Sequence, residues 1–94
     1  MKVSEDVLSL IGNTPLVRVN KLADGLGSEI YAKLEFTNPS GSFKDRVAKY
    51  IIDDAERRRL IKPGDLIVEA TSGNMGVAFA LVGAVRDYRC IFTL

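Results

Sequence analysis

One lysine stands directly after a loop of turn-forming residues, at the start of a predicted helix. The segment Asn38–Arg46 reads Asn-Pro-Ser-Gly-Ser-Phe-Lys-Asp-Arg, which places Lys44 in the first helical turn. Partial positive charge at a helix N-terminus disfavours an ammonium ion, and burial disfavours it further. A neutral amine can condense with an aldehyde, and the free amide groups there suit a phosphate or carboxylate. From spacing alone, the alternative is a solvated lysine beside Asp45, with Arg46 as a surface partner.

A second polar loop lies between a predicted strand and a predicted helix. Its residues, Thr71-Ser72-Gly73-Asn74, offer two hydroxyls, one side-chain amide and several backbone N–H donors. Ligands of open parallel sheets bind at this edge, and these donors suit a carboxylate or a phenolic oxygen. The structural alternative is that Ser72 or Asn74 only caps the following helix.

The elements that position these loops follow from the hydrophobic pattern. Apolar residues at three- and four-residue steps from Val47 to Ala55 predict a helix, with Ser42 as its N-cap. Four strands are predicted around it, at Leu16–Val19, Glu29–Glu35, Leu66–Val68 and Tyr88–Leu94. A weak helix is predicted at Val3–Leu10 and a buried helix at Met75–Val85. The final strand, helix and strand form a βαβ unit. The sequence therefore predicts an α/β fold, with a parallel sheet and flanking helices.

Composition limits the class of protein. Ninety-four residues make one small domain at most, with a narrow stability margin. A net charge of +1 argues against nucleic acid or an anionic membrane as the main partner. The absence of histidine removes Ser-His and Cys-His catalysis and most zinc sites. A single cysteine, Cys90, predicts a reducing cytoplasmic setting, and the longest apolar run, Met75–Val85, is too short to span a bilayer.

Three further features are interpreted as structural. The segment Gly12–Pro15 alone predicts only a turn. Cys90 lies in an apolar strand, which favours inert packing. Arg57–Arg59 is interpreted as a solvated helix end, since no second basic cluster supports a nucleic-acid surface.

Read together, these segments resemble the family of pyridoxal-phosphate-dependent enzymes that includes cysteine synthase and cystathionine β-synthase. The matching stretches agree in order and spacing across nearly the whole chain, at Ile11–Arg18, Lys33–Glu35, Gly41–Arg46, Leu60–Asp65 and Thr71–Asn74. The resemblance implies the N-terminal portion of the tryptophan synthase β-like fold. Residues 1–36, with two strands, would join a larger domain, and residues 37–94 would form part of a smaller cofactor-binding domain.

The resemblance also assigns roles to residues. The implied cofactor is pyridoxal 5'-phosphate, with Lys44 as the residue that would bind it covalently and act as acid and base at the substrate α-carbon. Asn74 would donate a hydrogen bond to the phenolic oxygen of the cofactor ring, and Thr71, Ser72, Gly73 and Asn74 would bind an amino-acid carboxylate. The implied reaction is β-replacement on serine or an O-activated serine by a thiol nucleophile, giving cysteine or cystathionine. Relatives are commonly homodimers.

The chain departs from the family pattern at three positions. Met75 replaces a common Thr beside the substrate loop, Ala70 replaces a common Pro before it, and Asp87 replaces a frequent Gly at a helix end. The resemblance places the phosphate-binding glycine loop beyond Leu94, so we expect weak cofactor binding and no turnover from these residues alone. The alternatives are a non-catalytic α/β binding or interaction module derived from such an enzyme, and an unrelated nucleotide-binding α/β domain. The nucleotide-binding alternative is disfavoured, because this chain has no glycine-rich phosphate-binding fingerprint between a strand and a helix.

Overall fold

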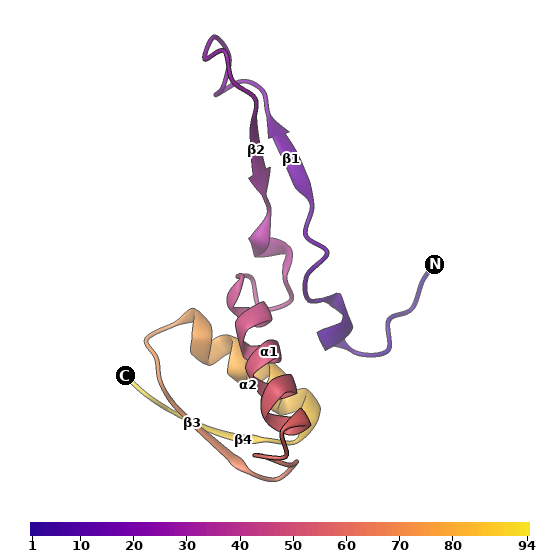
Figure 1. Ribbon diagram of the computed structural model, residues 1–94, viewed down its shortest axis with the longest axis vertical. Coiled ribbons are helices and arrows are strands. Elements are labelled where there is room, and N and C mark those ends of the chain that lie inside the picture. The colour runs from indigo at the N-terminus through magenta and orange to yellow at the C-terminus, as the bar shows by residue number, and fades with distance from the viewer.

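The computed structural model describes all 94 residues and contains four strands and two α-helices (Figure 1). In chain order the elements are β1 Leu16–Val19, β2 Ile30–Lys33, α1 Lys44–Arg57, β3 Leu66–Ala70, α2 Asn74–Arg86 and β4 Arg89–Thr93. Two short 3-10 helices lie at Val7–Leu10 and Glu35–Thr37. Every predicted strand and both longer helices are present, and the predicted N-terminal helix is reduced to one 3-10 turn.

The strands form two separate pairs. β3 and β4 are parallel and joined through α2, which confirms the predicted βαβ unit. β1 and β2 instead form an antiparallel hairpin of their own, with Leu16 opposite Lys33. Figure 1 shows this hairpin as an arm that projects from the helices. The parallel sheet of the prediction is therefore limited to β3 and β4.

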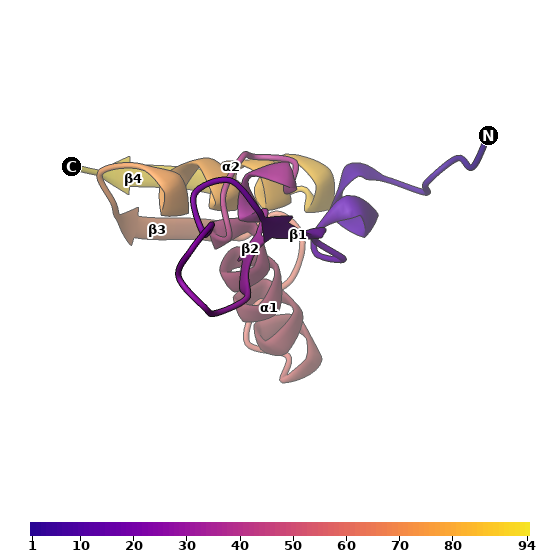
Figure 2. The same ribbon diagram turned by 90° about the horizontal axis from the view of Figure 1, so that it is seen from above.

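Helix α2 packs closely against β4 at Gly83 and against the end of β3 at Gly76. A Cβ added at Gly83 would lie 2.8 Å from the Cys90 Sγ, and one at Gly76 would lie 2.8 Å from the Thr71 Cγ2. The Cys90 thiol contacts the Phe79 carbonyl oxygen at 3.7 Å, and burial raises the pKa of this thiol. Cys90 is thus half-buried against α2, in line with the packing role that its sequence context predicts. In Figure 2, α2 runs back along the two strands, and α1 is set across them.

The core lies between the two helices. Ala48 and Ile52 of α1 and Ala78 and Val82 of α2 are buried at four-residue spacing, so one stripe of each helix faces the other. At the C-terminal ends, the Arg86 guanidinium is paired with two carboxylates of α1, those of Asp53 and Glu56. This packing fixes α1 against the βαβ unit.

The N-terminal boundary of α1 corrects one prediction. Ser42 is not the N-cap residue, because the helix begins at Lys44 and Phe43 occupies the cap position without a side-chain hydrogen bond. The Ser42 hydroxyl still accepts a hydrogen bond from the Lys44 backbone N–H at 3.2 Å. The helix end is as predicted, because Arg57 and Arg58 are exposed and paired only with Asp54. None of the helices combines the length and the apolar character that a membrane span requires.

Candidate functional site

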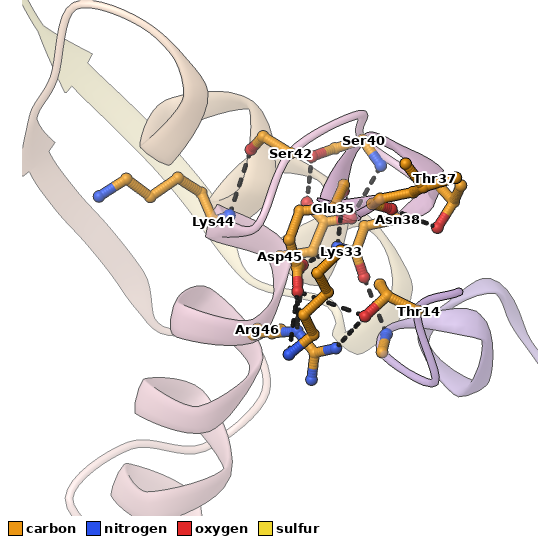
Figure 3. Close-up of polar contacts among 12 residues, drawn as sticks. Thr14, Lys33, Glu35, Thr37, Asn38, Ser40, Ser42, Lys44, Asp45 and Arg46 are labelled. Carbon is orange, nitrogen blue, oxygen red and sulfur yellow. Dashed lines mark hydrogen bonds and ion pairs between the residues drawn. The ribbon is translucent and has the colours of Figure 1, made fainter. Parts of the chain in front are cut away.

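Lys44 is the first residue of α1 and is half-buried. Its Nζ lies 4.8 Å from the centroid of the Phe43 ring. The amine makes no hydrogen bond and no ion pair with the rest of the chain, and only the Lys44 backbone N–H is engaged, by Ser42. Figure 3 shows the side chain extended away from Arg46 and Thr14. The structure therefore presents an amine that is shielded in part but has no polar partner.

Arg46, two residues further along α1, is the centre of a polar network. Its Nε donates to both carboxylate oxygens of Glu35 at 3.2 Å, and its Nη2 donates to the Thr14 hydroxyl at 3.0 Å (Figure 3). Partial burial alone would raise the pKa of Glu35, but hydrogen bonds from Arg46 and Asn38 outweigh it and lower this pKa. Arg46 thus ties α1 to Glu35 and Thr14, which is more than the role of a surface partner that the alternative interpretation gave it.

The turn at Gly12–Pro15 is part of the same network. The Gly12 backbone has φ of +90°, and a Cβ there would lie 3.2 Å from the Arg46 Nη1. The Gly12 N–H donates to the Asn38 Oδ1 at 2.8 Å. The local sequence predicts only a turn at this position, whereas in the structure Gly12 provides a positive φ and a close approach to Arg46. The spacing of the motif gave no sign of a partner 34 residues away.

The second predicted loop lies between β3 and α2. The Thr71 Oγ1 accepts hydrogen bonds from the N–H groups of Gly73 and Gly76, both at 3.2 Å, and so ties the loop to the first helical turn. The N-cap of α2 is Gly73, without a side-chain cap. Neither Ser72 nor Asn74 caps the helix, so the structural alternative for these two residues is wrong. Both side chains are exposed and make no hydrogen bond within the chain.

The loop also presents free backbone donors. The N–H groups of Ser72, Asn74 and Met75 have no partner in the chain. A shallow hollow beside them is lined by Thr71, Ser72, Gly73, Gly76, Val77, Phe92 and Leu94. Unpaired N–H groups at a helix N-terminus, where the helix dipole adds positive potential, are suitable donors for a carboxylate or phosphate.

The two loops belong to helices that pack together. Arg86 joins the C-terminal ends of α1 and α2, and both helices begin at their upper ends in Figure 1. No hydrogen bond, ion pair or common hollow connects Lys44 with Thr71–Asn74 in the chain itself. The structure thus brings the two helix starts to one side of the helix pair, without a contact between the Lys44 amine and the loop.

These features define a class of protein. The fold is an α/β unit in which a lysine begins one helix and unpaired amide donors begin the next, an arrangement that suits an anionic ligand bearing a carbonyl group. Residues 7–94 match the sequence family described as "Pyridoxal-phosphate dependent enzyme". The chain belongs to this family, whose members use pyridoxal phosphate.

Similar proteins agree with this assignment. Cystathionine beta-synthase of Mus musculus is 52% identical over 95 residues, which cover 99% of this chain and 17% of that protein. The structure of O-ureido-L-serine synthase superposes with a TM-score of 0.91 at 46% identity, covering 97% of this chain and 28% of that one. A hydrogen sulfide-producing enzyme from Fusobacterium nucleatum gives a TM-score of 0.91 at 46% identity, with 98% and 30% covered. The predicted family and fold class are confirmed, and the chain spans less than a third of these relatives.

The donor set fits the cofactor of the family. A primary amine at Lys44 matches an aldehyde carbon, and the free side-chain amide of Asn74 matches a phenolic oxygen. Both groups are without polar partners in the chain. No rearrangement of existing hydrogen bonds is needed to free them.

Proposed function

We propose that this chain carries the cofactor lysine and the carboxylate-binding loop of a pyridoxal-phosphate enzyme that performs β-replacement. The substrate is serine or an O-activated serine, and the nucleophile is a thiol such as sulfide or homocysteine. One observation carries the proposal: Lys44 begins α1, the Thr71–Asn74 loop leads into α2, and the two helices pack together. The Lys44 amine and the backbone N–H groups of Ser72, Asn74 and Met75 have no partner in the chain. The names of the relatives support the reaction class, since they include a cystathionine beta-synthase and an O-ureido-L-serine synthase.

Each residue has a distinct role in this proposal. Lys44 Nζ would hold the cofactor through its aldehyde carbon, with loss of water. Once the amino group of the substrate has taken its place there, the freed amine would accept and return the proton of the substrate α-carbon. The Asn74 side-chain amide donates to the phenolic oxygen of the cofactor ring. Pyridoxal phosphate, when bound, supplies an electron sink for bonds broken at the α- and β-carbons of the amino acid.

The loop at Thr71–Asn74 binds the substrate carboxylate. The free N–H groups of Ser72, Asn74 and Met75 and the Ser72 hydroxyl donate to its two oxygens. Thr71 acts within the loop, because its hydroxyl already accepts from Gly73 and Gly76. Movement of the loop over the bound amino acid then excludes water.

The domain roles are also part of the proposal. Residues 37–94 contain both candidate loops and belong to a cofactor-binding domain. Residues 1–36 contribute the β1–β2 hairpin to a larger domain of an enzyme several times longer than this chain. Turnover is therefore a property of that longer enzyme.

A titration of the 94-residue chain with L-serine tests the carboxylate site. We expect saturable changes in the amide NMR signals of Ser72, Asn74 and Met75 at about millimolar serine, because three free donors face one carboxylate. L-serine methyl ester keeps the amine and hydroxyl but lacks the carboxylate charge, so it should leave these signals unchanged.

Two variants complete this experiment. Ser72→Ala should weaken the serine-dependent changes severalfold, and Thr37→Ala, which alters an exposed hydroxyl elsewhere, should not. Equal responses to serine and its methyl ester would remove the loop from its proposed role.

A further inference from the structure

Asn38 and Asp45 are the two polar side chains that the fold buries, with 3% and 0% of their surface exposed. They lie seven residues apart: Asn38 is at the start of the loop that leads into α1, and Asp45 follows Lys44 in the first turn of α1. Burial of an amide or a carboxylate is unfavourable unless hydrogen bonds replace those made with water. The hydrogen-bond partners of these two side chains therefore indicate which parts of the chain they hold in place.

Asn38 fixes the beginning of the loop. Its Oδ1 accepts the Gly12 N–H at 2.8 Å, and its Nδ2 donates to the Glu35 carbonyl oxygen at 2.8 Å and to the Glu35 Oε2 at 2.7 Å. Both N–H bonds of the amide are used. Through Glu35 and Arg46, this end of the loop is tied to the first turn of α1 (Figure 3).

Asp45 fixes the end of the loop. One carboxylate oxygen accepts the Ser40 backbone N–H at 2.8 Å, and the other accepts the Ser40 hydroxyl. The carboxylate also lies in the first turn of α1, where the helix dipole favours negative charge. These contacts close a ring of backbone from Ser40 to Asp45 that includes Lys44.

The Lys44 amine has no tether of its own. Its contact within the chain is with the Phe43 ring, and Phe43 is itself half exposed. The direction of the side chain is therefore set by the backbone from which it leaves. That backbone is held by the ring closed at Asp45 and by the anchor at Asn38.

We propose that Asn38 and Asp45 are positioning residues for the Lys44 amine. They hold the Asn38–Asp45 segment by hydrogen bonds and make none with the Lys44 amine. The catalytic meaning of this positioning rests on the proposed function, whereas the positioning itself is a property of the chain without cofactor.

Trace acetylation of the chain measures how the Lys44 amine is positioned. The relative labelling rate of each lysine is read by peptide mass spectrometry, with exposed Lys21 as the internal reference. Asp45→Ala opens the ring, so the Lys44 to Lys21 ratio should rise about threefold or more as the first turn frays. Asp45→Asn keeps an oxygen for the Ser40 N–H and an amide donor for its hydroxyl, so its ratio should stay within about twofold of the wild type.

Asn38→Asp provides a second, nearly isosteric variant. It replaces two donated hydrogen bonds with a carboxylate facing Glu35, so it too should raise the Lys44 ratio about threefold or more. The matched control is Asp54→Ala, later on the same helix, which removes exposed ion pairs with Arg57 and Arg58. It should leave the Lys44 to Lys21 ratio unchanged.

Circular dichroism establishes that each variant is folded, and Ser40→Ala replaces Asp45→Ala if the latter unfolds. Ser40→Ala removes the hydroxyl bond and retains the backbone bond, so it should raise the ratio less than opening the ring does.

An unchanged Lys44 to Lys21 ratio in folded Asp45→Ala would overturn the proposal. The same result in folded Ser40→Ala would overturn it where that variant is the substitute. Equal effects of Asp45→Ala and Asp45→Asn would also overturn it, because charge would then matter in place of hydrogen-bond geometry. Labelling as expected in a chain that attaches pyridoxal phosphate at other lysines in preference to Lys44 would support the positioning and count against the proposed function.

Discussion

Single residues in this chain are constrained mainly by what lies directly against them. Gly12 is held against Arg46, Gly83 against Cys90, and Asp45 against Ser40. Lys44 differs from them, because its amine has no polar partner while its backbone is held on both sides. A reactive group that is free at its tip and fixed at its base is suited to bind an incoming ligand without first breaking a contact.

The closest packing in the fold gives a prediction at Gly83. An alanine in a helix normally gains about 1 kcal/mol over glycine. Here the added Cβ would lie 2.8 Å from the Cys90 Sγ and 3.2 Å from the Tyr88 carbonyl oxygen. We therefore expect Gly83→Ala to lower the free energy of unfolding by about 1–2 kcal/mol, measured by urea denaturation.

The double variant Gly83→Ala/Cys90→Ala provides the control, because it removes the Sγ atom that the new methyl group meets. It should recover part of the loss, which would appear as a favourable coupling energy between the two sites. A stabilised Gly83→Ala variant, or strict additivity of the two changes, would contradict the close packing.

The sequence predicts the positions of the candidate residues, but it does not predict the side chains that surround them. Turn formers and helix periodicity place Lys44 and Thr71–Asn74 at helix starts, whereas their proposed roles rest on the family resemblance. The burial of Asn38 and Asp45 was missed, since a local pattern does not show which polar residue will be enclosed. The spacing of Ser40 and Asp45 was the available signal, because short polar side chains near a helix start often bind neighbouring backbone groups.

At the scale of elements, the contact between α1 and α2 decides where the two loops lie. Apolar stripes pack along the helices, and Arg86 binds Asp53 and Glu56 at their C-terminal ends. Burial alone would raise the pKa of Asp53, but hydrogen bonds from Lys49 and Arg86 outweigh it and lower this pKa. Burial alone would lower the pKa of Arg86, but the carboxylates of Asp53 and Glu56 outweigh it and raise this pKa.

This ion cluster predicts a pH dependence of stability. The pKa of Asp53 is lower in the folded chain than its ordinary value of 3.8, so its contribution is complete above that value and lost as pH falls through the folded pKa. Arg86→Met should lower the free energy of unfolding by about 1–3 kcal/mol at pH 7. It should also reduce the loss of stability between about pH 5 and pH 2, measured by urea denaturation across that range.

Arg57→Met is the matched control, because Arg57 forms an exposed pair with Asp54 on the same helix. Its effect should remain below about 0.5 kcal/mol at pH 7, as exposed ion pairs contribute little. If both variants lost the same stability, the cluster at Arg86 would have no special part in joining the helices.

The helices and strands were predictable because each has a clear period or a clear boundary. The pairing of the strands was less predictable. A short alternating strand does not reveal whether its partner is parallel or antiparallel, and β1 and β2 form a hairpin apart from β3 and β4. The N-cap of α1 was predicted one residue early, at Ser42, because helix ends are set by tertiary contacts as well as by capping residues.

The whole molecule is extended for its length. The radius of gyration is 16.7 Å, whereas a compact chain of 94 residues has about 12 Å. Seven apolar residues form the core, and large apolar side chains such as Leu66, Val68 and Ile91 on the outer face of the parallel pair are exposed. Parallel sheets are usually covered on both faces. A narrow stability margin, predicted from length alone, follows from this small core.

The whole chain offers six lysines, of which Lys44 and Lys49 are half-buried and the other four are exposed. Lys49 is paired with Asp53, so Lys44 is the half-buried amine without an ion pair. Incubation with pyridoxal phosphate, reduction with borohydride and peptide mass spectrometry would locate the attached group. We expect it on Lys44 ahead of every other lysine, and its loss in Lys44→Ala without transfer to Lys49. Attachment spread over the exposed lysines, with Lys44 labelled no more than they are, would contradict the assignment of Lys44.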